Sequence, residues 1–494
     1  MAGERMSLVP QDTVIPVDGL TFLVPSRTFR IEGTLLKGGY VSLATEFALR
    51  LLRDAGELPP AEVGAFFGFS ERETRALIQE LLLDGYILVW SDRVRLSQRG
   101  EDAFNPITGD LLMLNIEPFG DTLSLDLVSF APIDATGGAR MPWLSEVEIP
   151  DKPKAAAATE AGRHGFRSNF GEWRERRFKG GAASTVRLQS IDEITPLGRG
   201  LTPVTVPVSY APTISDLIEP DFSGLRDRGR RGSREKLVDA LSNVVRGIIA
   251  PGDHLAAADA TAEWDRGILK SPASSTAAGV LRWLQVTHRG VPELPEWLSP
   301  SIRLAGSMTF PATASRLFEF IETAVQSDDD APPVFWLPAE HAAWGRSATL
   351  TDVVREMNSE ITPEGGIVLL PRADIDDRSR RELVRQYGGG KDGRSQALFG
   401  ACVAVPPDAL PLSLELVVQP TRWAVVLIHV PAPKTGFPVP IGYASTNSDV
   451  VDAISTRFAE AIAKAGEASV FWARAGMAPI TALEEIRRHL LSTV

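Results

Sequence analysis

Residues 61–104 read AEVGAFFGFSERETRALIQELLLDGYILVWSDRVRLSQRGEDAF and carry the clearest structural signal in the chain. Ser70 and Glu73 have the spacing of a capping box, in which the serine hydroxyl and the glutamate carboxylate each bond the other residue's backbone amide. The run that follows, ERETRALIQELLLDG, has the apolar spacing of a half-buried helix. Two short runs, YILVW and RVRLS, then predict a hairpin around the turn at Ser91-Asp92.

The residues before this stretch predict two further helices. In VSLATEFALRLLRDAG the apolar residues recur at helical spacing, and the face that we expect to be buried consists of Val41, Leu43, Phe47, Ala48 and Leu51. Pro59-Pro60 then interrupts the chain, and AEVGAFFG predicts a short second helix. In the third helix, the residues expected to pack inward are Leu77, Ile78, Leu81 and Leu82.

Three helices followed by a two-stranded hairpin, over residues 39–106, resemble a winged-helix domain. The ending LSQRGEDAF is similar to the L-T-x-x-G-x-x-A ending of many such domains. The resemblance implies that the third helix lies in the major groove of DNA, where base edges can be read. The residues expected to contact DNA are Ser70, Arg72, Arg75 and Gln79 on this helix, and Arg93, Arg95 and Arg99 on or just after the hairpin.

Two other interpretations of these arginines remain open. Four acidic residues offset them on the same helix, which fits an ordinary solvated surface: Glu71, Glu73, Glu80 and Asp84. Winged-helix domains also serve as protein-docking modules, so a protein partner is the second alternative to DNA.

The rest of the chain predicts a multidomain α+β protein. At about 150 residues per domain, 494 residues correspond to roughly three domains. We expect a segment of short strands, a winged helix, a mainly β region with basic loops, a helical region, and an α/β domain, at residues 1–38, 39–106, 107–234, 235–330 and 331–494. The run AAAATEAG in the third segment is expected to be a surface loop.

Two basic stretches lie in the region 107–234. The first contains Arg174, Arg176, Arg177 and Lys179, and the second contains Arg228, Arg230 and Arg231. Trp173 and Phe178 stand among the first set, and an aromatic ring beside arginines can stack on an unpaired base. The alternative is that these loops dock onto an acidic protein partner.

The C-terminal region resembles one half of a phospholipase D-like domain, at VVQPTRWAVVLIHVPAPKTGFPVPIGYASTNSDVVDAI, residues 417–454. Ser445 and Asn447 match the Gly-Ser-x-Asn element of that family, with a two-residue insertion after Gly442. The place of the family's His-x-Lys holds Thr421-Arg422-Trp423. The nucleophilic histidine and its lysine are therefore missing, and we expect a degenerate domain that binds backbone phosphate or protein without catalysis.

An unusual phosphodiesterase site is the alternative. Phosphodiester transfer in the phospholipase D family needs one histidine as nucleophile and a second as general acid. In this chain the available residues are His341, His429 and Lys434.

Composition limits the other functional classes. One cysteine, Cys402, excludes an internal disulfide and a thiolate cluster, and six histidines argue against a histidine-rich metal site. The acidic run at Asp374, Asp376 and Asp377 fits the first turn of a helix better than a magnesium site. We therefore expect no metal and no cofactor.

The N-terminus has no apolar signal core and no run of about 18 apolar residues occurs, so we expect a cytoplasmic protein without a membrane span. The net charge of −12 excludes a wholly basic surface, although local basic patches remain compatible with it. We expect a non-catalytic DNA-binding adaptor or targeting subunit with protein partners in a multi-subunit system, and a homo-oligomer as an option. The architecture is reminiscent of bacterial anti-phage defence subunits. The alternatives are the atypical phosphodiesterase or nuclease, and a ligand-sensing winged-helix transcription regulator.

Overall fold

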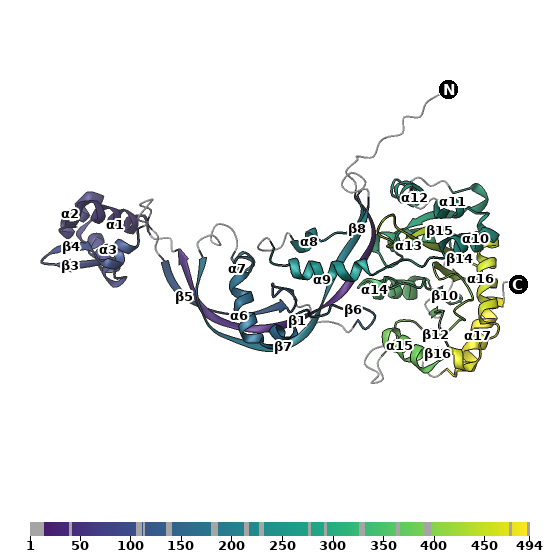
Figure 1. The fold of residues 1–494 in the computed structure, drawn as a ribbon. Coiled ribbons are helices and arrows are strands. Elements are labelled where there is room, and N and C mark those ends of the chain that lie inside the picture. Colours follow the sequence, from purple (N-terminus) through teal and green to yellow (C-terminus); the bar gives the residue numbers. More distant parts are fainter. Residues whose placement is uncertain are drawn as a thin grey trace, which may run out of the picture.

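The protein is a multidomain α+β chain with three parts (Figure 1). The computed structural model describes residues 14–38, 42–104, 111, 114–134, 141–178, 186–211, 217–226, 232–274, 278–290, 294–325, 331–361, 366–389, 397–473 and 477–491. We call residues 42–104 the head, residues 14–38 and 114–246 the arm, and residues 250–491 the body. The arm runs from the body to the head, which follows the outer end of its longest strands (Figure 1).

The head contains the helices and the hairpin that its sequence predicts. In chain order the elements are α1 (Leu43–Ala55), β2 (Glu57–Leu58), α2 (Pro60–Phe67), α3 (Glu71–Leu83), β3 (Ile87–Trp90), β4 (Arg93–Leu96) and α4 (Gln98–Asp102). The strands form a small antiparallel sheet in the order β2-β4-β3. The capping box is confirmed, because the Ser70 hydroxyl accepts from the Glu73 amide while the Glu73 carboxylate accepts from the Ser70 amide.

The face that α1 buries differs from the predicted one. The helix packs inward through Thr45, Ala48, Leu49 and Leu52, whereas Leu43 and Phe47 are 72% and 50% exposed. Apolar residues occur nearly all round this helix, so its periodicity fits either the predicted face or the observed one. The observed face is the one that contacts α3 and β4. On α3 the prediction holds for Leu77 and Leu81, which are buried, but is wrong for Leu82, which is exposed.

The arm is a sheet of unusually long strands. Its strands are β1 (Ile15–Gly38), β5 (Leu114–Asp126), β6 (Ser145–Glu146), β7 (Val186–Tyr210) and β8 (Ile218–Pro220). They lie in the order β5-β1-β7-β8, with β6 beside β1. The predicted short strands before residue 38 are therefore wrong: the Asp18-Gly19 and Pro25-Ser26 steps remain within β1. Pairing with β7 on one side and β5 on the other carries the strand through them, with bulges next to Asp18 and Phe29.

Five helices accompany this sheet: α5 (Lys152–Ala156), α6 (Ala158–Ser168), α7 (Phe170–Arg177), α8 (Ser223–Arg226) and α9 (Glu235–Arg246). The prediction of loops at AAAATEAG and at the first basic stretch is wrong. AAAATEAG lies in α5 and α6 except for Ala157 between them, and the basic stretch lies in α7 as far as Arg177. Gly162 and Gly165 lower the helix propensity of this segment, yet α6 requires glycine at both positions. A Cβ at Gly162 would come within 2.8 Å of the Phe29 ring, and one at Gly165 within 2.7 Å of the Phe130 carbonyl oxygen.

A mixed eight-stranded sheet forms the centre of the body. Its strands are β9 (Ser301–Ala305), β10 (Val334–Leu337), β11 (Ile367–Leu369), β12 (Ala401–Val403), β13 (Leu414–Gln419), β14 (Trp423–Pro431), β15 (Pro438–Ser445) and β16 (Val470–Trp472). The order is β16-β12-β11-β10-β13-β14-β15-β9, with β10, β11 and β12 parallel and the other neighbours antiparallel. Strand β9 comes from the predicted helical segment, which therefore shares its sheet with residues 331–494.

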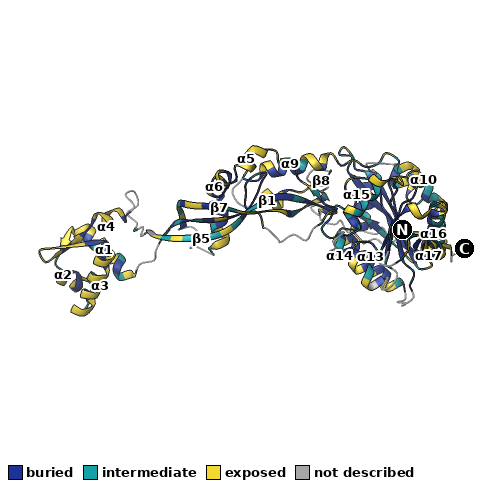
Figure 2. Cartoon of the chain, turned by 90° about the horizontal axis from the view of Figure 1, so that it is seen from below, coloured by how far each residue is buried: buried dark blue, intermediate teal, exposed yellow. Residues whose placement is uncertain are grey.

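Helices cover both faces of this sheet. They are α10 (His254–Asp265), α11 (Lys270–Ser274), α12 (Ala278–His288), α13 (Pro311–Ala324), α14 (Leu350–Glu356), α15 (Asp377–Tyr387), α16 (Ser448–Ile462) and α17 (Pro479–Leu491), with short helices at Glu296–Leu298, Met357–Ile361 and Glu467–Ser469. One core lies between the sheet and α10, α12, α16 and α17, and the other between the sheet and α13 and α14. Figure 2 shows the sheet buried and the outer helix faces exposed.

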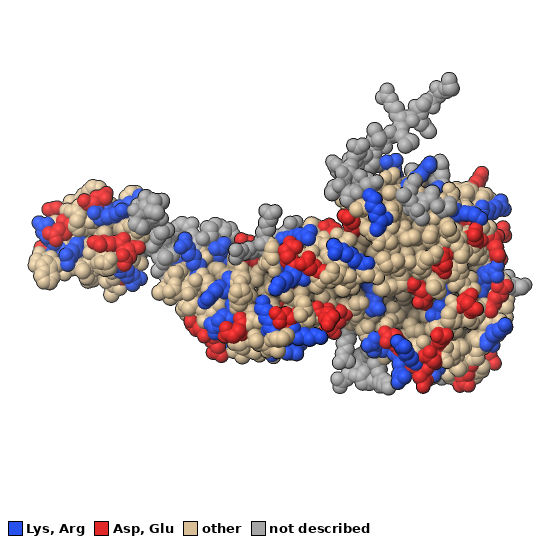
Figure 3. All heavy atoms as spheres, viewed as in Figure 1, with Lys and Arg blue, Asp and Glu red and all other residues tan. Residues whose placement is uncertain are grey.

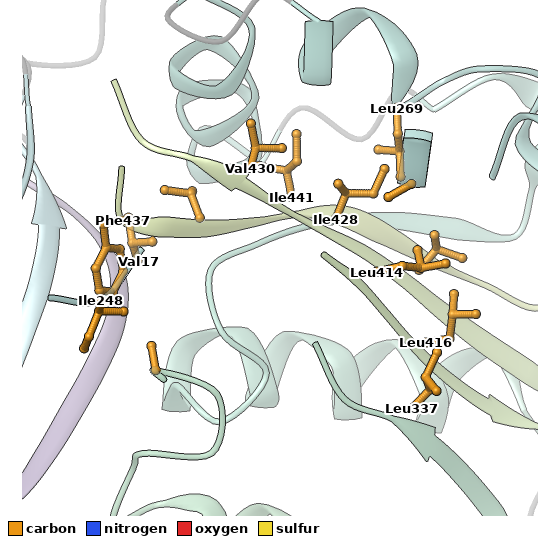
Figure 4. Packing of buried hydrophobic residues seen from close by; sticks show 14 of the residues in the cluster. Val17, Ile248, Leu269, Leu337, Leu414, Leu416, Ile428, Val430, Phe437 and Ile441 are labelled. Carbon is orange, nitrogen blue, oxygen red and sulfur yellow. The ribbon is translucent and has the colours of Figure 1, made fainter. Parts of the chain in front are cut away.

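The root of the arm shares a core with the body. Val17 of β1, Ile248 after α9 and Phe437 before β15 belong to one buried cluster (Figure 4). The Ser307 amide also donates to the Val17 carbonyl at 2.9 Å. These contacts join the root of the arm to the body through one shared core.

Candidate nucleic-acid interface

Three of the four contact residues predicted for the third helix lie on α3 itself, and the fourth, Ser70, is its N-cap. Arg72, Arg75 and Gln79 are all exposed. Arg75 pairs with Glu71 at 2.8 Å, one helical turn away, and both side chains are largely in water. Such exposed pairs contribute less than about 1 kcal/mol, so this arginine can exchange its partner for a phosphate. The Arg72 side chain makes no hydrogen bond or ion pair with another described residue.

The fourth residue, Ser70, is used within the chain. Its hydroxyl lies 2.7 Å from the Glu73 carboxylate, and the two residues close the capping box that begins α3. These hydrogen bonds lower the pKa of Glu73, so the carboxylate stays ionised and holds the cap. Ser70 is therefore a structural residue first, located at the helix end that favours anions.

The hairpin places its arginines on one exposed face, as alternation predicts. Along β4, Arg93 and Arg95 are exposed while Val94 and Leu96 point into the head core. The Arg93 side chain lies 3.5 Å from Glu57 of β2, and the Arg95 side chain makes no hydrogen bond or ion pair with described residues.

The last predicted contact residue of this region, Arg99, is exposed and follows the hairpin. Arg99 of α4 stacks over the Tyr86 ring, with its guanidinium carbon 4.9 Å from the ring centroid. Helix α3 contacts β3, and β3 pairs with β4, the hairpin strand that carries Arg93 and Arg95.

The head as a whole is not basic. Residues 42–104 contain seven Lys and Arg residues against eleven Asp and Glu residues, a net charge of −4. Figure 3 shows both signs interspersed on its visible face. Any attraction for nucleic acid would therefore be local to the arginines of α3 and the hairpin.

Most of the first basic stretch is engaged in the arm. Arg176 pairs with Asp134 at 2.8 Å and with Glu172 at 2.7 Å, and Arg174 donates to the Val186 carbonyl at 3.3 Å. Trp173 is buried and donates to Asp121 at 2.7 Å, so it is not available to stack on a base.

Phe178 packs edge-on against Trp173 in the core of the arm, and Arg177 remains exposed. The other predicted contacts of the basic stretches lie outside the described residues: Lys179, Arg228, Arg230 and Arg231.

The structure brings the two histidines of the body together. His341 Nε2 lies 2.7 Å from His429 Nδ1, and His429 Nε2 lies 2.7 Å from a carboxylate oxygen of Glu415. The other oxygen of Glu415 accepts from the indole nitrogens of Trp336 and Trp344, both at 2.8 Å. Sequence reasoning missed Glu415, although a charged residue within an apolar strand is a signal for a buried polar partner.

The hydrogen bonds that link His341, His429 and Glu415 define which ring nitrogens carry a proton. The Ala343 amide donates to His341 Nδ1 at 3.2 Å, so the proton of a neutral His341 lies on Nε2 and is donated to His429. His429 then donates to Glu415 from its own Nε2. Burial and the neighbouring His429 lower the pKa of His341 well below its ordinary value of 6.5, which fits a neutral ring.

In this arrangement every ring nitrogen of the pair has a partner. A histidine nucleophile needs a ring nitrogen with a free lone pair facing the substrate. Lys434 lies in the turn between β14 and β15 and forms no hydrogen bond with either histidine. The geometry thus fits a structural role for the two histidines.

The residues that resemble the Gly-Ser-x-Asn element also have structural partners. Ser445 is buried and donates to the carbonyls of Leu298 and Pro300. Asn447 caps α16 by accepting from the Asp449 amide and donates to the Trp297 carbonyl at 2.9 Å. Both side chains therefore fasten the start of α16 to the segment before β9.

The acidic run after β11 behaves as the sequence predicts. Asp376 is the N-cap of α15 and accepts from the amides of Arg378 and Ser379 at 2.8 and 2.7 Å. Within the described residues, no group of three or more His, Cys, Asp or Glu side chains is placed to hold a metal ion.

Comparison with known proteins adds no relative. The chain matches no known family profile, no curated protein and no solved structure. None of the described helices is long and apolar enough to cross a membrane.

Proposed function

We propose that this protein is a non-catalytic DNA-binding adaptor or targeting subunit of a multi-subunit system, with bacterial anti-phage defence as its setting. In this proposal the head is a winged helix that contacts DNA, and the body is a degenerate phospholipase D-like domain. The observation that carries the proposal is the exposure of Arg72, Arg75, Arg93 and Arg95 on α3 and β4. None of them is committed to the core of the head.

The position of the head supports the same function. Strand β1 has 24 residues, which at about 3.3 Å per residue corresponds to about 80 Å of chain. The head follows the outer end of this strand, away from the body (Figure 1). A module at the end of such an arm can reach a duplex while the body is occupied by a protein partner.

Duplex binding across a salt series tests the proposal. Arg72→Ala/Arg95→Ala removes the two arginines that have no described partner and leaves no carboxylate unpaired. Removing one contact to a phosphate should flatten the slope of log K against log salt by about 0.9, hence by about 1.8 for this variant.

The matched control removes two exposed arginines of the body, in Arg282→Ala/Arg289→Ala. Wild-type binding with a shallower slope only in the head variant supports the proposal. Equal slopes in wild type and head variant, or no binding by wild type, contradict it.

A protein-docking head is the second candidate, because large apolar side chains are exposed there. Leu83 and Trp90 are 87% and 73% exposed, and Leu88 and Val89 are about half exposed on the same hairpin strand as Trp90. Docking predicts that Leu83→Ser/Trp90→Ser abolishes co-purification with the native partner complex from the source cells. Leu255→Ser, at a half-exposed leucine of the body, is the control and should leave it unchanged.

A further inference from the structure

A cavity of about 480 Å³ lies where the arm meets the body. The end of β7, strand β8 and helices α8 and α9 form its arm side, and the turn between β14 and β15 forms its body side. Its volume falls within the usual range of small-molecule sites, and such sites occur preferentially at interfaces between domains.

Three cationic side chains line this cavity, each from a different element. Arg226 ends α8, Arg246 ends α9, and Lys434 lies in the turn before β15. Among the described residues of the lining Glu219 is the one carboxylate, so this part of the lining is positive within a chain of net charge −12. Because the three cations come from separate elements, their convergence is a property of the tertiary fold.

These cations are available to a ligand. The side chains of Arg246 and Lys434 make no hydrogen bond or ion pair with any other described residue. Arg226 has an ion pair with Glu235 at 3.3 Å, and both side chains are about half exposed. Lys434 also has a φ of 64°, a left-handed conformation that is uncommon for residues other than glycine. The turn holds it there through the bond from the Ala432 amide to the Phe437 carbonyl.

The inner wall of the cavity is apolar. Phe222 and Phe437 line it and are themselves buried, and Phe437 belongs to the core at the arm root (Figure 4). The site thus combines a cationic rim with an aromatic floor. Cations favour phosphate oxygens through charge-assisted hydrogen bonds, and the floor favours a flat or apolar group on the same ligand.

We propose that this cavity binds an organic phosphate of nucleotide size, with its phosphates on Arg226, Arg246 and Lys434 and its apolar portion toward Phe222 and Phe437. A ligand held in this way contacts arm and body at once, and so stabilises their junction. The proposal does not depend on DNA binding by the head, because the cavity and the head have no described residue in common.

Calorimetric titration of the full chain with ATP, AMP, inorganic triphosphate and a single-stranded oligothymidylate tests the proposal. ATP is expected to bind, and triphosphate to bind more weakly because it lacks an apolar portion. Arg246→Gln/Lys434→Gln should weaken ATP binding by about tenfold or more for each of the two cations replaced. Arg246→Lys/Lys434→Arg should retain most of it, and Arg282→Gln/Arg289→Gln on the body should retain all of it.

The outcomes separate the sources of phosphate. Binding of ATP or AMP that is lost in the double glutamine variant supports the proposal. Binding of oligothymidylate alone, no binding of any probe, or ATP binding that the double glutamine variant leaves unchanged overturns it. Both substituted residues are exposed, and an unchanged thermal unfolding midpoint of the variant without ligand verifies that it is folded.

Discussion

Replacing Asp18 by asparagine should stabilise the protein at alkaline pH far more than at acidic pH. Asp18 lies in β1 at the root of the arm and is only 5% exposed. Burial raises the pKa of its carboxyl from 3.8 to about 7, against smaller lowering effects from the Gly19 amide and Ser307. The folded protein therefore holds a proton that the unfolded chain releases above about pH 4.

The sign follows from this difference. A group with a raised pKa in the folded state contributes its full stability below pH 3.8, and that stability is lost as the pH rises through 7. The gap between 3.8 and about 7, at about 1.4 kcal/mol for each pH unit, corresponds to about 4 kcal/mol. Between pH 5 and pH 8 the wild type should lose about 2.5 kcal/mol from this residue.

Asparagine is neutral throughout this range and keeps an acceptor for the Gly19 amide, which now donates to Asp18 at 2.7 Å. Urea unfolding followed by tryptophan fluorescence at pH 5 and pH 8 measures the effect, because Trp336 and Trp423 are buried in the body. The difference in stability between Asp18→Asn and wild type should be about 2.5 kcal/mol more favourable at pH 8 than at pH 5.

The contributions of the other titrating groups to the pH dependence of stability cancel in that comparison, because these groups are the same in both proteins. Asp54→Asn, at an exposed aspartate of α1, is the matched control and should not alter the pH dependence. Parallel loss of stability in Asp18→Asn and wild type would refute the reasoning.

Three further substitutions test the packing. Arg234→Ala removes the buried one of the two arginines that bond the Glu172 carboxylate at 2.7 Å, Arg176 being the other, and should cost about 1.5–3 kcal/mol in urea unfolding. Glu172→Ala/Arg234→Ala should cost less than the sum of the two single replacements. Ser70→Ala should destabilise α3 by about 1 kcal/mol, seen as faster hydrogen exchange of its first amides, and equal exchange rates would contradict the capping role. Gly442→Ala should cost about 3 kcal/mol or more, because its Cβ would overlap a carbonyl oxygen of β14, whereas Gly198→Ala in β7 meets open space and should be tolerated.

Local signals in the sequence were sufficient for the elements of the head. The capping box at Ser70 and the alternation of Arg93 and Arg95 depend on neighbouring residues, and both are present in the structure. The same holds for the N-cap at Asp376.

Features that depend on distant residues could not be predicted in this way. The continuity of β1 through Pro25-Ser26 is set by pairing with β7, which lies more than 150 residues away. Helix α6 contains glycines because its neighbours Phe29 and Phe130 leave no room for a Cβ. A helix-propensity scale contains only the unfavourable free energy of glycine in a helix and no term for this packing.

The hydrogen-bonded residues His341, His429 and Glu415 show that candidate sites, too, depend on residues that are distant in the sequence. His341 and His429 are 88 positions apart, and only the sheet brings them within a hydrogen bond. Glu415 joins them from β13, the strand beside β14, on which His429 lies. Arg246 is a comparable case at the cavity, because its sequence context is an ordinary basic residue in the last turn of a helix.

The single cysteine of the chain permits a direct test of contact between head and DNA. Cys402 is fully buried, and burial raises the pKa of its thiol well above the usual value, so it should resist labelling. Gln79→Cys introduces a reactive thiol on the exposed face of α3, and Lys464→Cys introduces one on the body as a control.

The decisive measurement is photocrosslinking to duplex DNA from a probe attached at these two positions. The account predicts crosslinks from position 79 that fade as salt is raised, and none from position 464. DNA binding without a crosslink at position 79, or equal crosslinking from both positions, would contradict the claim that the head carries the DNA contact.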